Sequence, residues 1–73
     1  METYGIRKQE SNAPDLVYMV GDGSFSDALE EYRRIARNAW RSTRNYMQVE
    51  FSKVQKMSWW RGTTHYYVEL VKM

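Results

Sequence analysis

The clearest indication of the fold is the stretch SFSDALEEYRRIARNAWR, residues 24–41. Apolar residues recur in it every three to four positions, namely at Phe25, Leu29, Tyr32, Ile35 or Ala36, and Ala39 or Trp40. This spacing predicts an amphipathic helix over about residues 25–41. Ser24 is a residue type that caps helix starts, and Asp27 three positions later makes a weaker form of the capping box.

Beyond this helix the apolar residues follow the period of a strand. Met47, Val49 and Phe51 alternate with polar residues, which is the pattern of a half-buried strand. The alternation slips at Lys53-Val54, and this slip indicates a bulge or the approach to a turn.

The C-terminal part of the sequence predicts a last strand and a hairpin. Residues 63–73 are rich in β-branched and aromatic residues, and an alternating pattern places Tyr66, Val68 and Leu70 on one face. Residues 57–62 are predicted to form the tip of the hairpin, because Gly62 suits a turn.

Two further strands are predicted upstream, over residues 3–8 and 16–20, with a loop at Pro14 between them. The chain is therefore predicted to be one α+β domain of residues 1–73. Its expected order is ββαββ, with four short, mainly antiparallel strands and one amphipathic helix on one sheet face. A chain of this size can build only one core.

Composition excludes several classes of site. The sequence has no cysteine, hence no disulfide and no thiolate metal site. No apolar run approaches the ~20 residues that span a bilayer, and the first residues lack the basic and apolar pattern of a signal peptide. We therefore expect a protein of the host-cell cytosol, without a membrane partner, a bound metal or a cofactor.

Charge is unevenly distributed along the chain although the net charge is only +2. Residues 1–31 contain two basic and seven acidic side chains, whereas residues 32–73 contain nine basic and two acidic ones. Five arginines lie within twelve residues and predict a positive ridge for phosphate or carboxylate partners: Arg33, Arg34, Arg37, Arg41 and Arg44. The alternative is a solvated helix face that Glu30 and Glu31 partly neutralise.

Trp59, Trp60 and Arg61 form the second candidate binding feature. Neighbouring side chains in a strand point to opposite sides, so the sheet face under the helix can hide only one of the two tryptophans. The other is predicted to be exposed, and exposed tryptophan and arginine are typical of interface hot spots and of stacking on nucleobases. The alternative is a tryptophan that folds back over the edge of the small core.

Catalysis is not expected, because His65 is the only histidine and no cysteine is present. The segment Gly62-Thr63-Thr64-His65-Tyr66-Tyr67 resembles the Gly-Ser-His strand of HicA-like messenger-RNA toxins. Thr64 replaces the serine of that family, and the expected element order differs from it. A small ribonuclease that uses His65 is therefore the third hypothesis.

The expected plan resembles that of small phage-encoded inhibitors. Residues 17–20, a short turn, residues 25–32 and a strand hairpin are similar to the phage inhibitor of host RNA polymerase and to compact anti-CRISPR proteins. The resemblance implies a non-enzymatic inhibitor or adaptor, encoded by a phage or mobile element. Its partner would be a host protein or nucleoprotein complex of the nucleic-acid machinery. The second hypothesis is direct binding of single-stranded nucleic acid or RNA.

Overall fold

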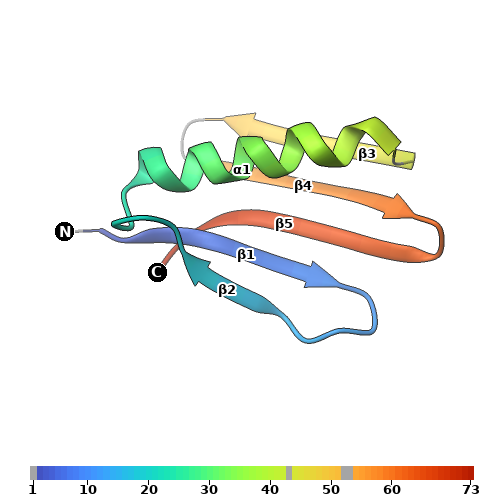
Figure 1. Cartoon of the computed structure of the whole chain (residues 1–73), viewed down its shortest axis with the longest axis horizontal. Helices are drawn as coiled ribbons and strands as arrows, with labels where there is room; N and C mark the ends of the chain where they lie inside the picture. Colours follow the sequence, from blue (N-terminus) through green and yellow to red (C-terminus); the bar gives the residue numbers. More distant parts are fainter. Residues whose placement is uncertain (1, 43, 52–53) are drawn as a thin grey trace.

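The computed structural model describes residues 2–42, 44–51 and 54–73, and for residues 42, 44, 45, 51 and 54 it describes the backbone alone. Within these residues the chain forms one α-helix, a short 3-10 turn and five strands (Figure 1). The elements in chain order are β1 (Tyr4–Glu10), β2 (Leu16–Met19), α1 (Phe25–Ala39), η1 (Trp40–Ser42), β3 (Arg44–Phe51), β4 (Val54–Arg61) and β5 (Thr64–Lys72).

The strands form one antiparallel sheet in the order β2-β1-β5-β4-β3. Strands β1 and β5, from the two ends of the chain, pair at the centre, and α1 lies across one face of the sheet (Figure 1). The α+β class and the single helix are confirmed. The prediction of four strands is wrong, because residues 54–61 form β4 rather than a hairpin tip.

Strand β4 escaped prediction because polar residues occupy both of its faces. Its helix-side positions hold Gln55 beside Met57 and Trp59, so the strand shows no clean alternation of apolar and polar residues. The turn at Gly62 is confirmed, and its φ of 63° is the left-handed conformation that glycine adopts without strain. The slip in alternation was predicted at Lys53-Val54: Val54 begins β4, and Lys53 lies outside the described residues.

The alternation predicted around Met47 and Val49 is present, but its apolar side is not the buried side. Gln48 pairs with Met57, which is buried under α1, so Gln48 shares the helix-covered face. Met47 and Val49 therefore point to the opposite face and are 67% and 43% exposed. The half-buried pattern of the sequence is thus inverted, because only pairing with β4 decides which side of β3 faces the helix.

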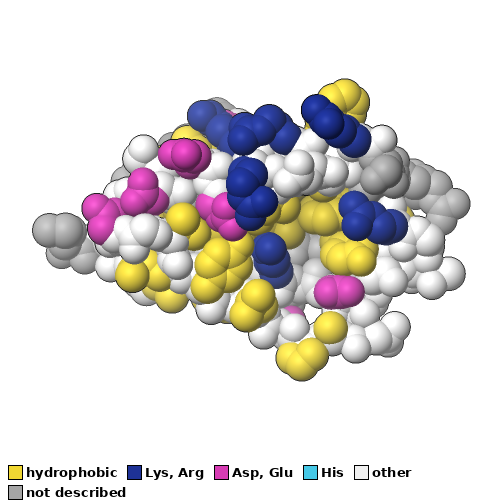
Figure 2. All heavy atoms as spheres, viewed as in Figure 1, with side chains coloured by type: hydrophobic (Ala, Val, Ile, Leu, Met, Phe, Trp, Pro, Cys, Tyr) yellow, Lys and Arg dark blue, Asp and Glu magenta, His cyan; other side chains and the backbone are white. Residues whose placement is uncertain are grey.

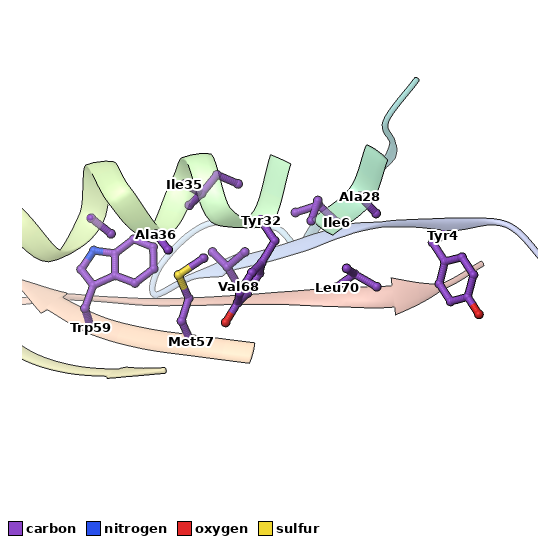
Figure 3. Close-up of a cluster of buried hydrophobic side chains, with 11 residues drawn as sticks. Tyr4, Ile6, Ala28, Tyr32, Ile35, Ala36, Met57, Trp59, Val68 and Leu70 are labelled. Atoms are coloured by element: carbon purple, nitrogen blue, oxygen red, sulfur yellow. The ribbon is translucent and has the colours of Figure 1, made fainter. Parts of the chain in front are cut away.

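The core lies between α1 and the three inner strands (Figure 3). Tyr32 from α1 is fully buried, and Trp59 from β4 stacks on Tyr66 from β5 at 5.2 Å between ring centroids. The core consists of Tyr4, Ile6, Ala28, Tyr32, Ile35, Ala36, Ala39, Met57, Trp59, Val68 and Leu70.

The helix begins and ends close to its predicted limits. The Ser24 side chain accepts a hydrogen bond of 3.1 Å from the backbone N–H of Asp27, which confirms the cap. Of the two residues proposed to close the apolar stripe, Ala39 enters the core and Trp40 begins η1. The Trp40 side chain is 62% exposed as a result.

Candidate binding surfaces

The acidic and basic side chains are unevenly distributed over the molecular surface. Figure 2 shows most acidic side chains near the end of the molecule where α1 begins and most basic ones farther along α1, with some acidic side chains beside the basic ones. Exposed hydrophobic side chains lie between the basic ones on the same face (Figure 2). The uneven charge of the sequence therefore becomes an uneven charge of the surface.

The predicted arginine ridge is divided by ion pairs. Arg34 donates two hydrogen bonds to the Glu31 carboxylate, at 2.7 and 2.8 Å, and these bonds lower the pKa of Glu31. Arg33 pairs with Glu50 of β3. Within the described part of the chain Arg37 forms no ion pair, so its guanidinium is the more available to a partner.

The structure describes the side chain of one of the two remaining ridge residues, Arg41, but not that of Arg44. Arg41 lies exposed in η1, beyond the end of α1. Arg44 starts β3, and its side chain lies outside the described residues.

A second contact of Glu31 ties α1 to β2. The Tyr18 hydroxyl donates a hydrogen bond of 2.8 Å to the Glu31 carboxylate. Burial, followed by this hydrogen bond, raises the pKa of Tyr18 to about 12. Glu31 is therefore used to hold the helix in place and to pair with Arg34.

A groove of about 520 Å³ opens between the C-terminal half of α1 and β3. We call it the α1–β3 groove, and its lining residues are Arg33, Ala36, Arg37, Trp40, Tyr46 and Gln48. The Tyr46 hydroxyl donates a hydrogen bond of 2.7 Å to Oε1 of Gln48, which holds the carboxamide at the groove. Burial raises the pKa of the Tyr46 hydroxyl.

Sequence reasoning placed Arg33 and Arg37 in a binding site but missed the other polar and aromatic groove residues. The sequence offered Ala39 or Trp40 for the last position of the core stripe, and a stripe needs only one of two adjacent positions. That redundancy is the signal that could have identified Trp40. Tyr46 and Gln48 gave no such signal, because their position beside the helix depends on how β3 pairs.

The sheet face opposite α1 carries no covering element among the described residues. Large apolar side chains lie exposed on it, and they are interspersed with Arg7, Lys56 and Glu69. We call this the uncovered face, and its exposed apolar residues are Val17, Met19, Met47, Val49 and Trp60. Part of it is hollowed by about 130 Å³ between Met47, Val49 and Tyr67.

Trp59 and Trp60 divide as predicted, one as core and the other as surface. Trp59 is 6% exposed under α1, and Trp60 is 38% exposed on the uncovered face. Arg61 shares the helix side with Trp59 and lies 5.8 Å from the ring centroid of Tyr66. The three predicted residues therefore do not form one site, and Trp59 is not available as a surface contact.

His65 lies on the uncovered face, where its ring centroid is 4.9 Å from that of Trp60. It borders a shallow hollow that also includes Glu10, Asp15 and Tyr67. Asp15 accepts a hydrogen bond of 3.0 Å from Gln9 and pairs with Arg7. No set of three or more His, Asp or Glu side chains among the described residues is arranged to hold a metal ion.

Comparisons with protein-family models, with curated proteins and with solved structures found no match. The fold, the α1–β3 groove and the uncovered face therefore provide the evidence on function. Among the described residues, no helix combines the length and the apolar character that crossing a bilayer requires.

Proposed function

We propose that this chain is a non-enzymatic binding protein that docks on a host protein or nucleoprotein complex through its uncovered face. The observation that carries the proposal is the exposure of Met47, Val49 and Trp60 on a sheet face that no described element covers. Met47 and Val49 are neighbours on this side of β3, and groups of exposed apolar side chains on a small domain are characteristic of interaction sites. Their exposure leaves this apolar area without the stabilisation that burial would supply.

The composition of the uncovered face also fits a protein partner. Aromatic and methionine side chains are enriched at interface centres, and charged groups lie at their rims. Trp60 and Met47 supply the aromatic and methionine side chains. Arg7 and Lys56 project from the inner strands β1 and β4 of the same face and offer positive charge to the partner. The hollow beside Tyr67 offers a place for one apolar side chain of the partner.

The resemblance to phage-encoded inhibitors extends the proposal to the kind of target. The sequence resembles such inhibitors in its expected plan of one helix on an antiparallel sheet, and this chain has one helix and a five-stranded antiparallel sheet. We propose that it is encoded by a phage or mobile element and occupies a surface of the host nucleic-acid machinery, such as a CRISPR surveillance complex. Inhibition would then be stoichiometric and would involve no turnover.

The test uses two variants that each add one carboxylate at an exposed position. Met47→Glu changes the uncovered face, and Asn38→Glu changes the outer side of α1. The protein captured from host lysate by the wild-type chain is purified, and its affinity for each variant is measured. We expect Met47→Glu to weaken binding at least about tenfold and Asn38→Glu to leave it unchanged.

Two outcomes would overturn the proposal. The first is unchanged binding of a folded Met47→Glu variant, with the fold checked by circular dichroism. The second is a captured complex that nuclease treatment dissolves, because contact would then run through nucleic acid. Direct binding of single-stranded nucleic acid is the second candidate function, and the α1–β3 groove is the observation that favours it.

A further inference from the structure

We propose that the α1–β3 groove binds single-stranded nucleic acid, with one base against Trp40 and a backbone phosphate held by Arg37 and Arg33. This inference rests on the second candidate function and deepens it by naming the groups that bind base and phosphate, and its residues differ from those of the uncovered face. Gln48 of the groove and Met47 of the uncovered face point to opposite sides of β3. The two surfaces can therefore be occupied at the same time.

Trp40 provides the flat surface that a base needs. Its side chain is 62% exposed, the second most exposed among the large hydrophobic side chains that the structure describes. The helix ends at Ala39, which takes the last core position, so Trp40 is turned out along the groove. Stacking of a base on an exposed aromatic ring occurs with every base, because each has a π-face.

Arg37 and Arg33 place positive charge on the same wall of the groove. They lie four residues apart on α1, about 6 Å along the helix axis, and so project from the same side of it. Arg33 shares its charge with Glu50, whereas Arg37 has no ion-pair partner within the described residues. A phosphate beside Arg37 would supply the missing counter-charge.

The opposite wall adds polar groups that suit a base edge. Tyr46 and Gln48 project from β3, and the hydrogen bond between them fixes the Gln48 carboxamide. A fixed carboxamide offers both a donor and an acceptor to a base. The volume of about 520 Å³ lies within the roughly 300–1,000 Å³ typical of sites for small ligands, so one nucleotide fits.

These features together favour a nucleic acid over an acidic peptide. A peptide carboxylate would pair with Arg37 but would make no use of the flat face of Trp40. A single-stranded nucleic acid uses both, because each of its units carries a phosphate and a ring. Duplex DNA is not expected to bind in this way, since its bases are stacked on one another.

The test is fluorescence anisotropy with labelled oligo-dT, oligo-U and a DNA duplex, measured over a salt series. We expect the single strands to bind at low salt and to bind more weakly as salt rises. Trp40→Ala should weaken binding at least about tenfold, and Trp40→Phe should recover part of the loss. Arg37→Gln should reduce the salt slope by about one phosphate contact, or ~0.7.

Trp60→Ala is the matched control, because it removes the same side chain from the other face. It should leave oligonucleotide binding unchanged, whereas Met47→Glu tests the docking function separately. The proposal is overturned if neither single strand binds at low salt, or if Trp60→Ala weakens binding as much as Trp40→Ala. It is equally overturned if an oligo-glutamate peptide displaces the single strand at equal concentration.

Discussion

The two faces of the sheet contain similar side chains but differ in what covers them. Trp59 and Trp60 are neighbours in β4, and the first is buried under α1 while the second lies on the uncovered face. The same contrast separates Met57, which is 2% exposed, from Met47 at 67%. Large apolar side chains thus serve stability on one face and remain available for binding on the other.

The position of α1 therefore determines which large apolar side chains belong to the core and which remain at the surface. A strand presents alternate side chains to opposite faces, so a helix over one face can bury only every second residue of the strands beneath it. The side chains of the uncovered face are not needed to fill the core. Their apolar character is consistent with the proposed docking function, and the contrast between the two faces predicts which substitutions affect stability.

The largest expected effect is that of Trp59→Ala. Removing this buried indole, which stacks on Tyr66, should lower the free energy of unfolding by about 3–5 kcal/mol. Trp60→Ala should change it by less than about 1 kcal/mol, because Trp60 is partly solvated. Urea denaturation of both variants measures the difference. Equal losses would show that the uncovered face is also part of the core.

The second prediction compares Leu29, which packs against the core, with Met47 on the uncovered face. Leu29 on α1 is only partly buried against the core, so Leu29→Ala should cost about 2 kcal/mol, near the lower limit for such truncations. Met47→Ala should cost less than about 0.5 kcal/mol, because Met47 is exposed. Thermal melts provide the measurement. A larger loss of stability for Met47→Ala than for Leu29→Ala would contradict the surface position of Met47.

The helix cap tests how the covering layer is held. Ser24→Ala removes the acceptor of the Asp27 N–H and should lower stability by about 1 kcal/mol. Ser26→Ala removes the same hydroxyl from an exposed helical position and serves as the control. Chemical denaturation should separate the two variants. If they are equally stable, the cap does not contribute to docking of α1.

The smallest expected effect concerns the Glu31 network and depends on pH. Hydrogen bonds from Arg34 lower the pKa of Glu31 below its ordinary value of 4.5. A lowered pKa in the folded state stabilises the protein fully above the unfolded value, and this stabilisation is lost as the pH falls through the folded value. Glu31→Gln should therefore lower the melting temperature near neutral pH and have little effect in strong acid. A difference that persists in strong acid would contradict the assigned role of the charge.

Part of the candidate sites could be predicted from the sequence, since local features carry the information. Arg33 and Arg37 were identified from their density along the helix, and the split between Trp59 and Trp60 from strand alternation. Which tryptophan is buried was not predictable, because residues 54–61 were not recognised as a strand. Trp40 and Tyr46 meet only when β3 lies beside α1, and no short-range pattern encodes that approach.

The amino-acid sequence alone predicts the α+β class, the helix with its Ser24 cap, the faces of β5 and the turn at Gly62. Each of these depends on interactions within a few residues, such as the 3.6 period, the capping hydrogen bond and the φ of glycine. The strand order, the outward face of β3 and the α1–β3 groove follow only from how distant segments pack in three dimensions. These depend on pairing between distant segments, and a one-residue change in the pairing of a strand moves all its side chains to the opposite face of the sheet.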